Sequence, residues 1–321
     1  MGRDKGARVD LEPMKRSWVR ALGGANRAQG TIRIYERAVQ GFRVFLLEEY
    51  EPDGEGAPPA PTELEGERGI HRDHVAQYLI HVRENSGIAT ANQQYRSLKT
   101  FFNWLVDEEE MDRSPMRKMK APEYVEPQVP VVPEDALKRL LKTCQGKGFE
   151  ERRDLAILLL FIDSGPRLSE LTNRTMEELD LDMKVLRVLG KAGRHRSLPF
   201  GKATTLALDR YLRALPKFLK RAPDDDEALW WSTHKRPLTI WGVGRMVKRR
   251  GAQAGLPELH PHQFRHTMAH QWQIEGGNDD DLMRIMGWRS RQMLSRYGAS
   301  AGEERAREAH RRRSPGDRLA G

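Results

Sequence analysis

A stretch near the carboxyl end of the chain collects basic side chains and then presents a single tyrosine. Within residues 259–297, His262 and Arg265 are separated by two residues, which places both on one face of a predicted helix. A short helix follows and ends at Gly287, and Tyr297 comes near the end of another short segment. Arginine binds phosphate well and tyrosine can form covalent intermediates, so the stretch predicts an active site.

Two upstream residues supply more positive charge. An apolar run over residues 155–162 leads directly into a Gly-Pro pair, which predicts that one helix ends and another starts with Arg167 at the turn. Glu170 lies one turn further and is expected to brace Arg167 by a charge-assisted hydrogen bond. Alternating residues over 185–189 and again over 194–199 predict a β-hairpin with Lys191 at its turn.

Each of these residues also has an ordinary structural interpretation. Arg265 alone would be a surface arginine, and Tyr297 alone a half-buried aromatic residue. His262, His266 and His270 repeat every four residues, as on a metal-binding face, but the HExxH pattern and a suitably spaced acidic ligand are missing. Packing histidines are therefore favoured, and a metallohydrolase remains an alternative that a chelator would reveal.

The composition favours an acidic polymer as partner. The 321 residues carry a net charge of +9, with 38% hydrophobic and 31% charged residues, enough for two domains. Basic side chains are mainly arginine, the better bidentate phosphate ligand, although a GC-rich genome would produce the same excess. The single cysteine, Cys144, excludes an intramolecular disulfide framework, and no apolar run is long enough to span a membrane. We expect a cytoplasmic protein.

The chain divides into four parts. Residues 1–28 are predicted to be a flexible segment, and residues 29–120 a small bundle of amphipathic helices. Residues 121–133 contain four prolines without a helical period and predict an extended linker. Residues 134–321 form the second domain, mostly helical around the predicted hairpin. Exposed Arg83, Arg96 and Lys99 of the bundle, and Lys248, Arg249 and Arg250 of the second domain, are candidate DNA contacts.

Five segments of this sequence together resemble the tyrosine recombinases of the phage integrase and Xer type. The segment SGPRLSEL (164–171) is similar to the first arginine motif of that family, and LGKAGRHRSLPF (189–200) to its lysine-bearing hairpin. HPHQFRHTMA (260–269) resembles the His-x-x-Arg motif, and IMGWRSRQMLSRY (285–297) the motif that ends in the nucleophile. The helices between about Thr31 and Glu110 are similar to the family's core-binding domain by pattern more than by motif.

This resemblance implies a mainly α fold, with an N-terminal, SAM-like core-binding bundle and a catalytic domain that carries a small antiparallel sheet. It implies a site-specific recombinase that forms a 3′-phosphotyrosyl intermediate, with Tyr297 as nucleophile. Arg167 and Arg265 would grip the phosphate oxygens, and Trp288 would offer an indole N–H and packing. His262 would assist proton removal from Tyr297 or donate to the phosphate, and Lys191 would protonate the leaving 5′ oxygen. No metal or nucleotide cofactor is expected.

The implied partners are double-stranded DNA and further copies of the chain, which would form a tetramer on DNA. The charged pattern EERAREAHRRR, residues 303–313, is too polar to stand alone and is predicted to dock on a neighbouring protomer. The location would be a bacterial cell or a phage-infected bacterium. A type IB topoisomerase, or a DNA-binding protein with a relict site, remains an alternative, and the target DNA sequence is left open.

Overall fold

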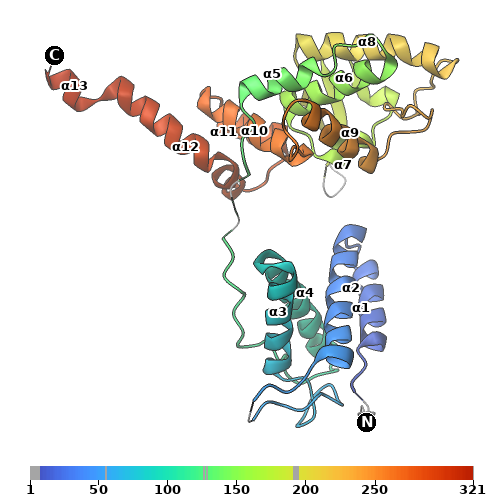
Figure 1. Cartoon of the computed structure of the whole chain (residues 1–321), viewed down its shortest axis with the longest axis vertical. Helices are drawn as coiled ribbons and strands as arrows, with labels where there is room; N and C mark the ends of the chain where they lie inside the picture. The colour runs from blue at the N-terminus through green and yellow to red at the C-terminus, as the bar shows by residue number, and fades with distance from the viewer. Residues whose placement is uncertain (1–7, 55, 126, 128, 191–194, 321) are drawn as a thin grey trace. The chain divides into compact units, whose positions relative to one another are not determined.

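The chain folds into two compact units, Met1–Pro127 and Gln128–Gly321 (Figure 1). The structure is a computed structural model that describes residues 8–54, 56–125, 127, 129–190 and 195–320; for 295–301, 303–305 and 308 it describes the backbone alone. The boundary between the units falls inside the proline-rich segment 121–133. No helix in the described part of the chain has the length and apolar character that crossing a bilayer requires.

The first unit is an all-helical bundle. Its elements are α1 (Glu12–Gly24), α2 (Gln29–Val44), the π-helical turn η1 (Phe45–Glu49), α3 (Arg72–Ser86) and α4 (Ile88–Asp107). An aromatic core holds them together: Trp18 of α1 stacks on Tyr35 of α2 at 5.3 Å between ring centroids and contacts Phe101 of α4 at 5.1 Å. The bundle therefore buries one apolar face from each of its long helices.

The prediction of a flexible N-terminal segment is wrong for residues 8–28. Helix α1 occupies most of this stretch, and Leu11, Trp18 and Leu22 are buried in the bundle. Glu12 and Pro13 begin the helix, and both are favourable in a first helical turn. The segment is ordered because its few large apolar residues find partners on α2 and α4.

The second unit is mostly helical and carries one small sheet. Its helices are α5 (Glu134–Lys142), α6 (Phe149–Ser164), α7 (Leu168–Thr172), the 3₁₀ turn η2 (Met176–Glu178), α8 (Lys202–Leu219), α9 (Ile240–Gln253), α10 (Pro261–Ile274), α11 (Asp279–Met286), α12 (Arg291–Arg313) and α13 (Pro315–Ala320). The three antiparallel strands are β1 (Leu179–Asp180), β2 (Val185–Leu189) and β3 (His195–Pro199). The mainly α fold with a small antiparallel sheet, as predicted, is confirmed.

Helix α6 is the centre of the second unit, with α8, α10 and β3 packed around it. Its buried residues include Ile157, Leu160 and Phe161, which explains the continuous apolar run in the sequence. Phe161 stacks on Phe264 of α10 at 5.4 Å between ring centroids. This packing brings the end of α6 to α10, so that the first arginine motif and the His-x-x-Arg motif meet.

Candidate active site

The corner between α6 and α7 holds Arg167 in a fixed position. Gly165 ends α6 in the left-handed conformation (φ 53°), and Arg167 is the N-cap of α7. A carboxylate oxygen of Glu170, Oε2, accepts the backbone N–H of Arg167 at 2.8 Å, and Oε1 accepts from Nη1 of Arg167 at 2.7 Å. The hydrogen bond expected between these two residues is therefore present. The Arg167 side chain stays 40% exposed, whereas that of Glu170 is only 4% exposed.

Arg265 is buried against the same corner. Its Nη1 donates to the carbonyl oxygen of Gly165 at 2.8 Å, and its Nη2 donates to the carbonyl oxygen of Met286. The guanidinium lies over the ring of Trp288, 5.4 Å from its centroid. Because Arg265 is 1% exposed, the interpretation of this residue as a surface arginine is wrong. Two arginines from distant motifs thus share one site.

Gly165 permits this close approach. A Cβ atom at this position would lie 3.1 Å from the Cα of Arg265 and 3.1 Å from the terminal methyl of Met286. The positive φ of Gly165 would also strain any residue with a side chain. The glycine is therefore required both by the backbone turn and by the contact with α10.

The histidines of α10 differ in exposure. His262 is exposed near the start of the helix, and His266 is buried one turn later, with its ring edge-on to that of His262 at 4.8 Å between centroids. His270 is half-buried. Among the residues that the structure describes, no group of three or more His, Cys, Asp and Glu side chains is placed to hold a metal ion. The arrangement of His262 and His266 is that of packed aromatic rings.

Helix α12 carries Tyr297 and begins at the site. Asn278 caps α11 and Gly287 ends it in the left-handed conformation. Trp288 then packs in an apolar cluster with Met286 and with Leu294 of α12. The backbone of Tyr297 lies in the first half of this 23-residue helix, so the prediction that it comes near the end of a short segment is wrong. Its side chain is outside the described residues.

The predicted hairpin is confirmed in its strands. Strand β2 pairs with β3 in an antiparallel register from Val185 opposite Pro199 to Leu189 opposite His195. Lys191 lies outside the described residues, and its role as general acid stays a prediction.

Arg196 of β3 joins the cluster, and the sequence analysis missed it. Its Nη2 donates to Oε2 of Glu170 at 2.7 Å, and its side chain is 11% exposed. Burial alone would raise the pKa of Glu170, but the charge of Arg196 and the hydrogen bonds from Arg196 and Arg167 outweigh burial and lower it. Arg196 lies two residues before buried Leu198, so both side chains point to the same face of the strand. This period of two was the signal that could have placed Arg196 inward.

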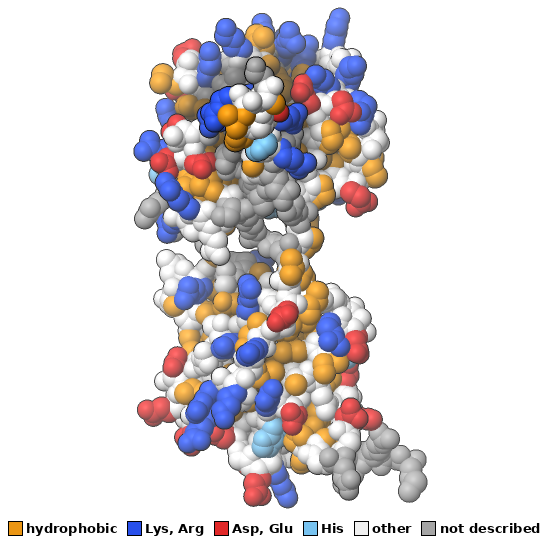
Figure 2. Space-filling view, turned by 90° about the vertical axis from the view of Figure 1, so that its left-hand side faces the viewer, with side chains coloured by type: hydrophobic (Ala, Val, Ile, Leu, Met, Phe, Trp, Pro, Cys, Tyr) orange, Lys and Arg blue, Asp and Glu red, His pale blue; other side chains and the backbone are white. Residues whose placement is uncertain are grey.

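The predicted DNA contacts divide into exposed and engaged residues. Arg83, Arg96 and Lys99 of the first unit and Lys248 of the second are exposed. Figure 2 shows many Lys and Arg side chains on the visible face of the first unit, with Asp and Glu side chains among them. Arg249 is partly exposed but donates to Glu150 at 2.9 Å and to Asp154 at 2.8 Å.

Arg250 does not belong to a DNA-contacting patch. It is 5% exposed, and its Nε donates to Asp154 at 2.8 Å while its Nη1 donates to the carbonyl oxygen of Thr143 at 2.6 Å. The assignment from the sequence is wrong because Arg250 falls on the face of α9 that also buries Val243, Met246 and Val247.

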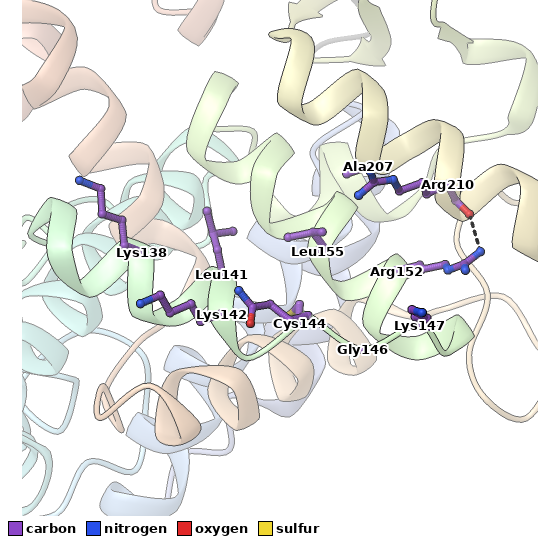
Figure 3. Close-up of a pocket in the computed structure, with 11 residues that line it drawn as sticks. Lys138, Leu141, Lys142, Cys144, Gly146, Lys147, Arg152, Leu155, Ala207 and Arg210 are labelled. Carbon is purple, nitrogen blue, oxygen red and sulfur yellow. Dashed lines mark hydrogen bonds between the residues drawn. The ribbon is translucent and has the colours of Figure 1, made fainter.

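A separate cavity of about 950 Å³ lies between α5, α6 and α8 (Figure 3). Leu141 and Leu155 line it together with basic residues such as Lys142, and Arg152 donates to the carbonyl oxygen of Arg210 at 3.5 Å beside it. None of the predicted catalytic residues is among its lining residues. The arginine cluster thus lies at the opposite end of α6 from Arg152 of this cavity.

Comparison with known proteins agrees with this geometry. The profile of the phage integrase family matches residues 130–304. A tyrosine recombinase XerC from Staphylococcus carnosus is 28% identical over 212 residues, covering 65% of this chain and 70% of that protein. A tyrosine recombinase XerD from Listeria monocytogenes is 24% identical over 259 residues, covering 80% of this chain and 83% of that protein.

Solved structures share the fold. The integrase of transposon Tn1549 in complex with circular intermediate DNA has a TM-score of 0.71 and 21% identity, covering 94% of this chain and 99% of that one. A lambda integrase tetramer bound to a Holliday junction has a TM-score of 0.67 and 17% identity, covering 92% of this chain and 79% of that one. Since the family profile spans more than half of the 321 residues, the chain belongs to the phage integrase family of tyrosine recombinases, which break and rejoin DNA.

Proposed function

We propose that this chain is a site-specific DNA recombinase that cuts and rejoins strands through a 3′-phosphotyrosyl intermediate on Tyr297. The observation that carries the proposal is the meeting of Arg167 and Arg265 at Gly165, beside the start of the helix that bears the tyrosine. Two positive charges at one corner, Arg167 exposed and Arg265 buried, suit a phosphodiester, whose non-bridging oxygens gain charge when a nucleophile attacks.

The arginines have different tasks in this proposal. Arg167 is half exposed and fixed by Glu170, so it can meet a phosphate directly. Arg265 is buried, so contact with a phosphate requires the side chains that cover it to move when DNA binds. Each fixed donor is typically worth about 3 to 4 kcal/mol in the transition state.

Proton transfers complete the reaction. The hydroxyl of Tyr297 attacks phosphorus, and exposed His262 takes its proton, because a phenol with a pKa near 10 attacks poorly at neutral pH. The bond from phosphorus to the 5′ oxygen breaks, and Lys191 gives this oxygen a proton. Trp288 offers an indole N–H and packing. The hydroxyl of another strand later attacks the phosphotyrosine and releases the enzyme.

The proposed partners are double-stranded DNA and further copies of this chain. The similar structures include integrases in complex with DNA, one of them a tetramer bound to a Holliday junction. Helix α12 starts against α10 and α11, its C-terminal part extends away from the other helices of its unit (Figure 1), and its described residues between 306 and 313 are exposed. We propose that residues 303–313 dock on a neighbouring protomer. Deletion after Ser300 should then impair multi-protomer assembly on DNA more than binding of one protomer; equal losses would contradict docking.

The decisive experiment uses Tyr297→Phe. Duplexes selected from a random DNA pool by the wild-type protein serve as probes. The variant should bind them with unchanged affinity and form no denaturant-resistant adduct, whereas the wild-type protein should form one at a defined sequence, even in excess EDTA. An adduct from the variant would show that the nucleophile is misassigned.

Other outcomes separate the alternatives. The absence of an adduct from the wild-type protein would indicate a DNA-binding protein with a relict site. Adducts without sequence preference would indicate a type IB topoisomerase. Cleavage that EDTA abolishes and added metal restores would indicate a metallohydrolase.

A further inference from the structure

The carboxylate of Glu170 is shared by two guanidiniums, and the sharing decides how Arg167 is presented. Oε1 accepts from Nη1 of Arg167 at 2.7 Å, and Oε2 accepts from Nη2 of Arg196 at 2.7 Å. Arginine and carboxylate often pair through two parallel hydrogen bonds. Here the second oxygen, Oε2, already accepts from Arg196 and from the backbone N–H of Arg167 at 2.8 Å, so a further bond from the Arg167 side chain would compete with Arg196. Among the described residues the Arg167 side chain is therefore held through Nη1, and it stays 40% exposed.

Arg196 also determines the net charge of the cluster. One carboxylate and one guanidinium would be neutral together, whereas the second guanidinium leaves an excess of one positive charge beside Arg167. Burial lowers the pKa of Arg196, with the charge of Glu170 opposing that effect, but an arginine stays protonated in proteins. The excess charge favours an incoming phosphate over closure of Arg167 onto Glu170.

The environment of Arg196 is costly for the folded protein. Its Nε and Nη1 are buried and have no hydrogen-bond acceptor among the described residues. Its stem lies against Gly287, where an added Cβ would be 3.1 Å from the Cδ of Arg196. Buried donors without acceptors destabilise a fold, so this side chain is better explained by its effect on the site than by stability.

We infer that Arg196 is a positioning residue that keeps Arg167 available to the scissile phosphate by occupying Glu170 and supplying the excess positive charge. The inference rests on the proposed function. In the absence of Arg196, Arg167 closes onto both oxygens of Glu170 and withdraws from DNA. Arg196 acts through Arg167 and not on the leaving oxygen.

Three variants separate charge from packing. Arg196→Met keeps an unbranched apolar stem but removes the charge. It should slow covalent-adduct formation at saturating DNA on the order of 10- to 100-fold, which is less than the roughly 10²- to 10³-fold loss of rate expected when a donor to the phosphate itself is removed. Arg196→Lys keeps the charge and should stay within a few-fold of wild type. Arg187→Met, at an exposed arginine of the neighbouring strand, is the matched control and should have no effect.

A double-mutant cycle then tests the route of action. Arg196→Met should slow the reaction much less in an Arg167→Ala background than in the wild-type background, because the residue through which it acts is gone. On DNA with sulfur in place of the bridging 5′ oxygen, Arg196→Met should remain slow. Lys191→Ala should recover on this DNA, since a thiolate leaves without help from an acid.

Several results would overturn the inference. One is an unchanged rate of adduct formation for Arg196→Met. Another is an equal slowing by Arg196→Met in the Arg167→Ala and wild-type backgrounds. A third is recovery of the Arg196→Met rate on the sulfur DNA. If Arg196→Met does not fold by circular dichroism, Arg196→Gln replaces it and should be slower than Arg196→Lys; equal rates would refute the charge effect. Failure of the wild-type protein to form any adduct would instead overturn the proposed function.

Discussion

Two carboxylates of the second unit, Asp154 and Glu170, each accept hydrogen bonds from more than one arginine. The two clusters differ in how many of their arginines are buried and in which elements they connect. Asp154 on α6 is fully buried and accepts from the buried Arg153 and Arg250 and from Arg249, whose side chain is 44% exposed. Glu170 on α7 is nearly as buried, but one of its two arginines, Arg167, remains 40% exposed. The Asp154 cluster connects α6 to α9 and buries two of its three arginines, whereas the Glu170 cluster connects α7 to β3 at the corner where Arg265 reaches Gly165. We propose that the same residue types serve stability in the first cluster and phosphate binding in the second.

The first way to break this comparison is to remove Asp154. Asp154→Asn should lower the free energy of unfolding by about 3 to 5 kcal/mol, because it leaves the buried guanidiniums of Arg153 and Arg250 without their shared carboxylate. Chemical denaturation measures the change. Asp135→Asn, in an exposed pair with Arg139, is the control and should be unaffected. A stable Asp154→Asn protein would contradict the structural role assigned to the cluster.

The converse experiment removes the exposed member of the other cluster. Arg167→Ala should reduce the rate of adduct formation about 10²- to 10³-fold and change the melting temperature little, because the side chain supports a phosphate more than the fold. Rapid-quench kinetics and calorimetry on the same preparation give both values. Sulfur in place of the bridging oxygen should not relieve this defect. A variant that loses stability and keeps its rate would reverse the comparison.

Acid should distinguish the Glu170 cluster by its effect on stability. The pKa of Glu170 lies below its ordinary value of 4.5, so its contribution to stability is complete above that pH and is lost as the pH falls through the lowered value. The wild-type protein should therefore lose stability below pH 4.5 more steeply than Glu170→Gln. Urea titrations between about pH 3 and 6, the range in which carboxyl groups titrate, measure this slope. Parallel curves for the two proteins would argue against a coupled carboxylate.

The smallest effect concerns two adjacent residues of α9. Lys248 is exposed, whereas Arg249 is paired with Asp154. Lys248→Ala should weaken DNA binding and reduce the slope of log affinity against log salt by about 1, as expected for one phosphate contact. Arg249→Ala should change this slope less and lower stability instead. Fluorescence anisotropy at several salt concentrations measures the slope, and equal slopes for the two variants would remove the distinction.

Local signals in the sequence determined most of the framework. Gly165 and Gly287 end helices because few other residues adopt a positive φ, the amphipathic periods place α2 and α4, and the continuous apolar run places α6. The hydrogen bond between Arg167 and Glu170 was predictable because it joins residues three positions apart. The strands of the hairpin followed from their alternation. Each of these features depends on neighbours within one or two turns.

Only the tertiary structure decided which charged residues are buried and which are presented. Arg250 reaches Asp154 across 96 residues, Arg265 reaches Gly165 across 100, and Arg196 reaches Glu170 across 26. Helix α1 is ordered because Trp18 finds Tyr35 and Phe101, which its own segment could not indicate. A guanidinium is exposed or buried according to the carboxylates and carbonyls that packing brings to it, and those groups lie far away in the sequence.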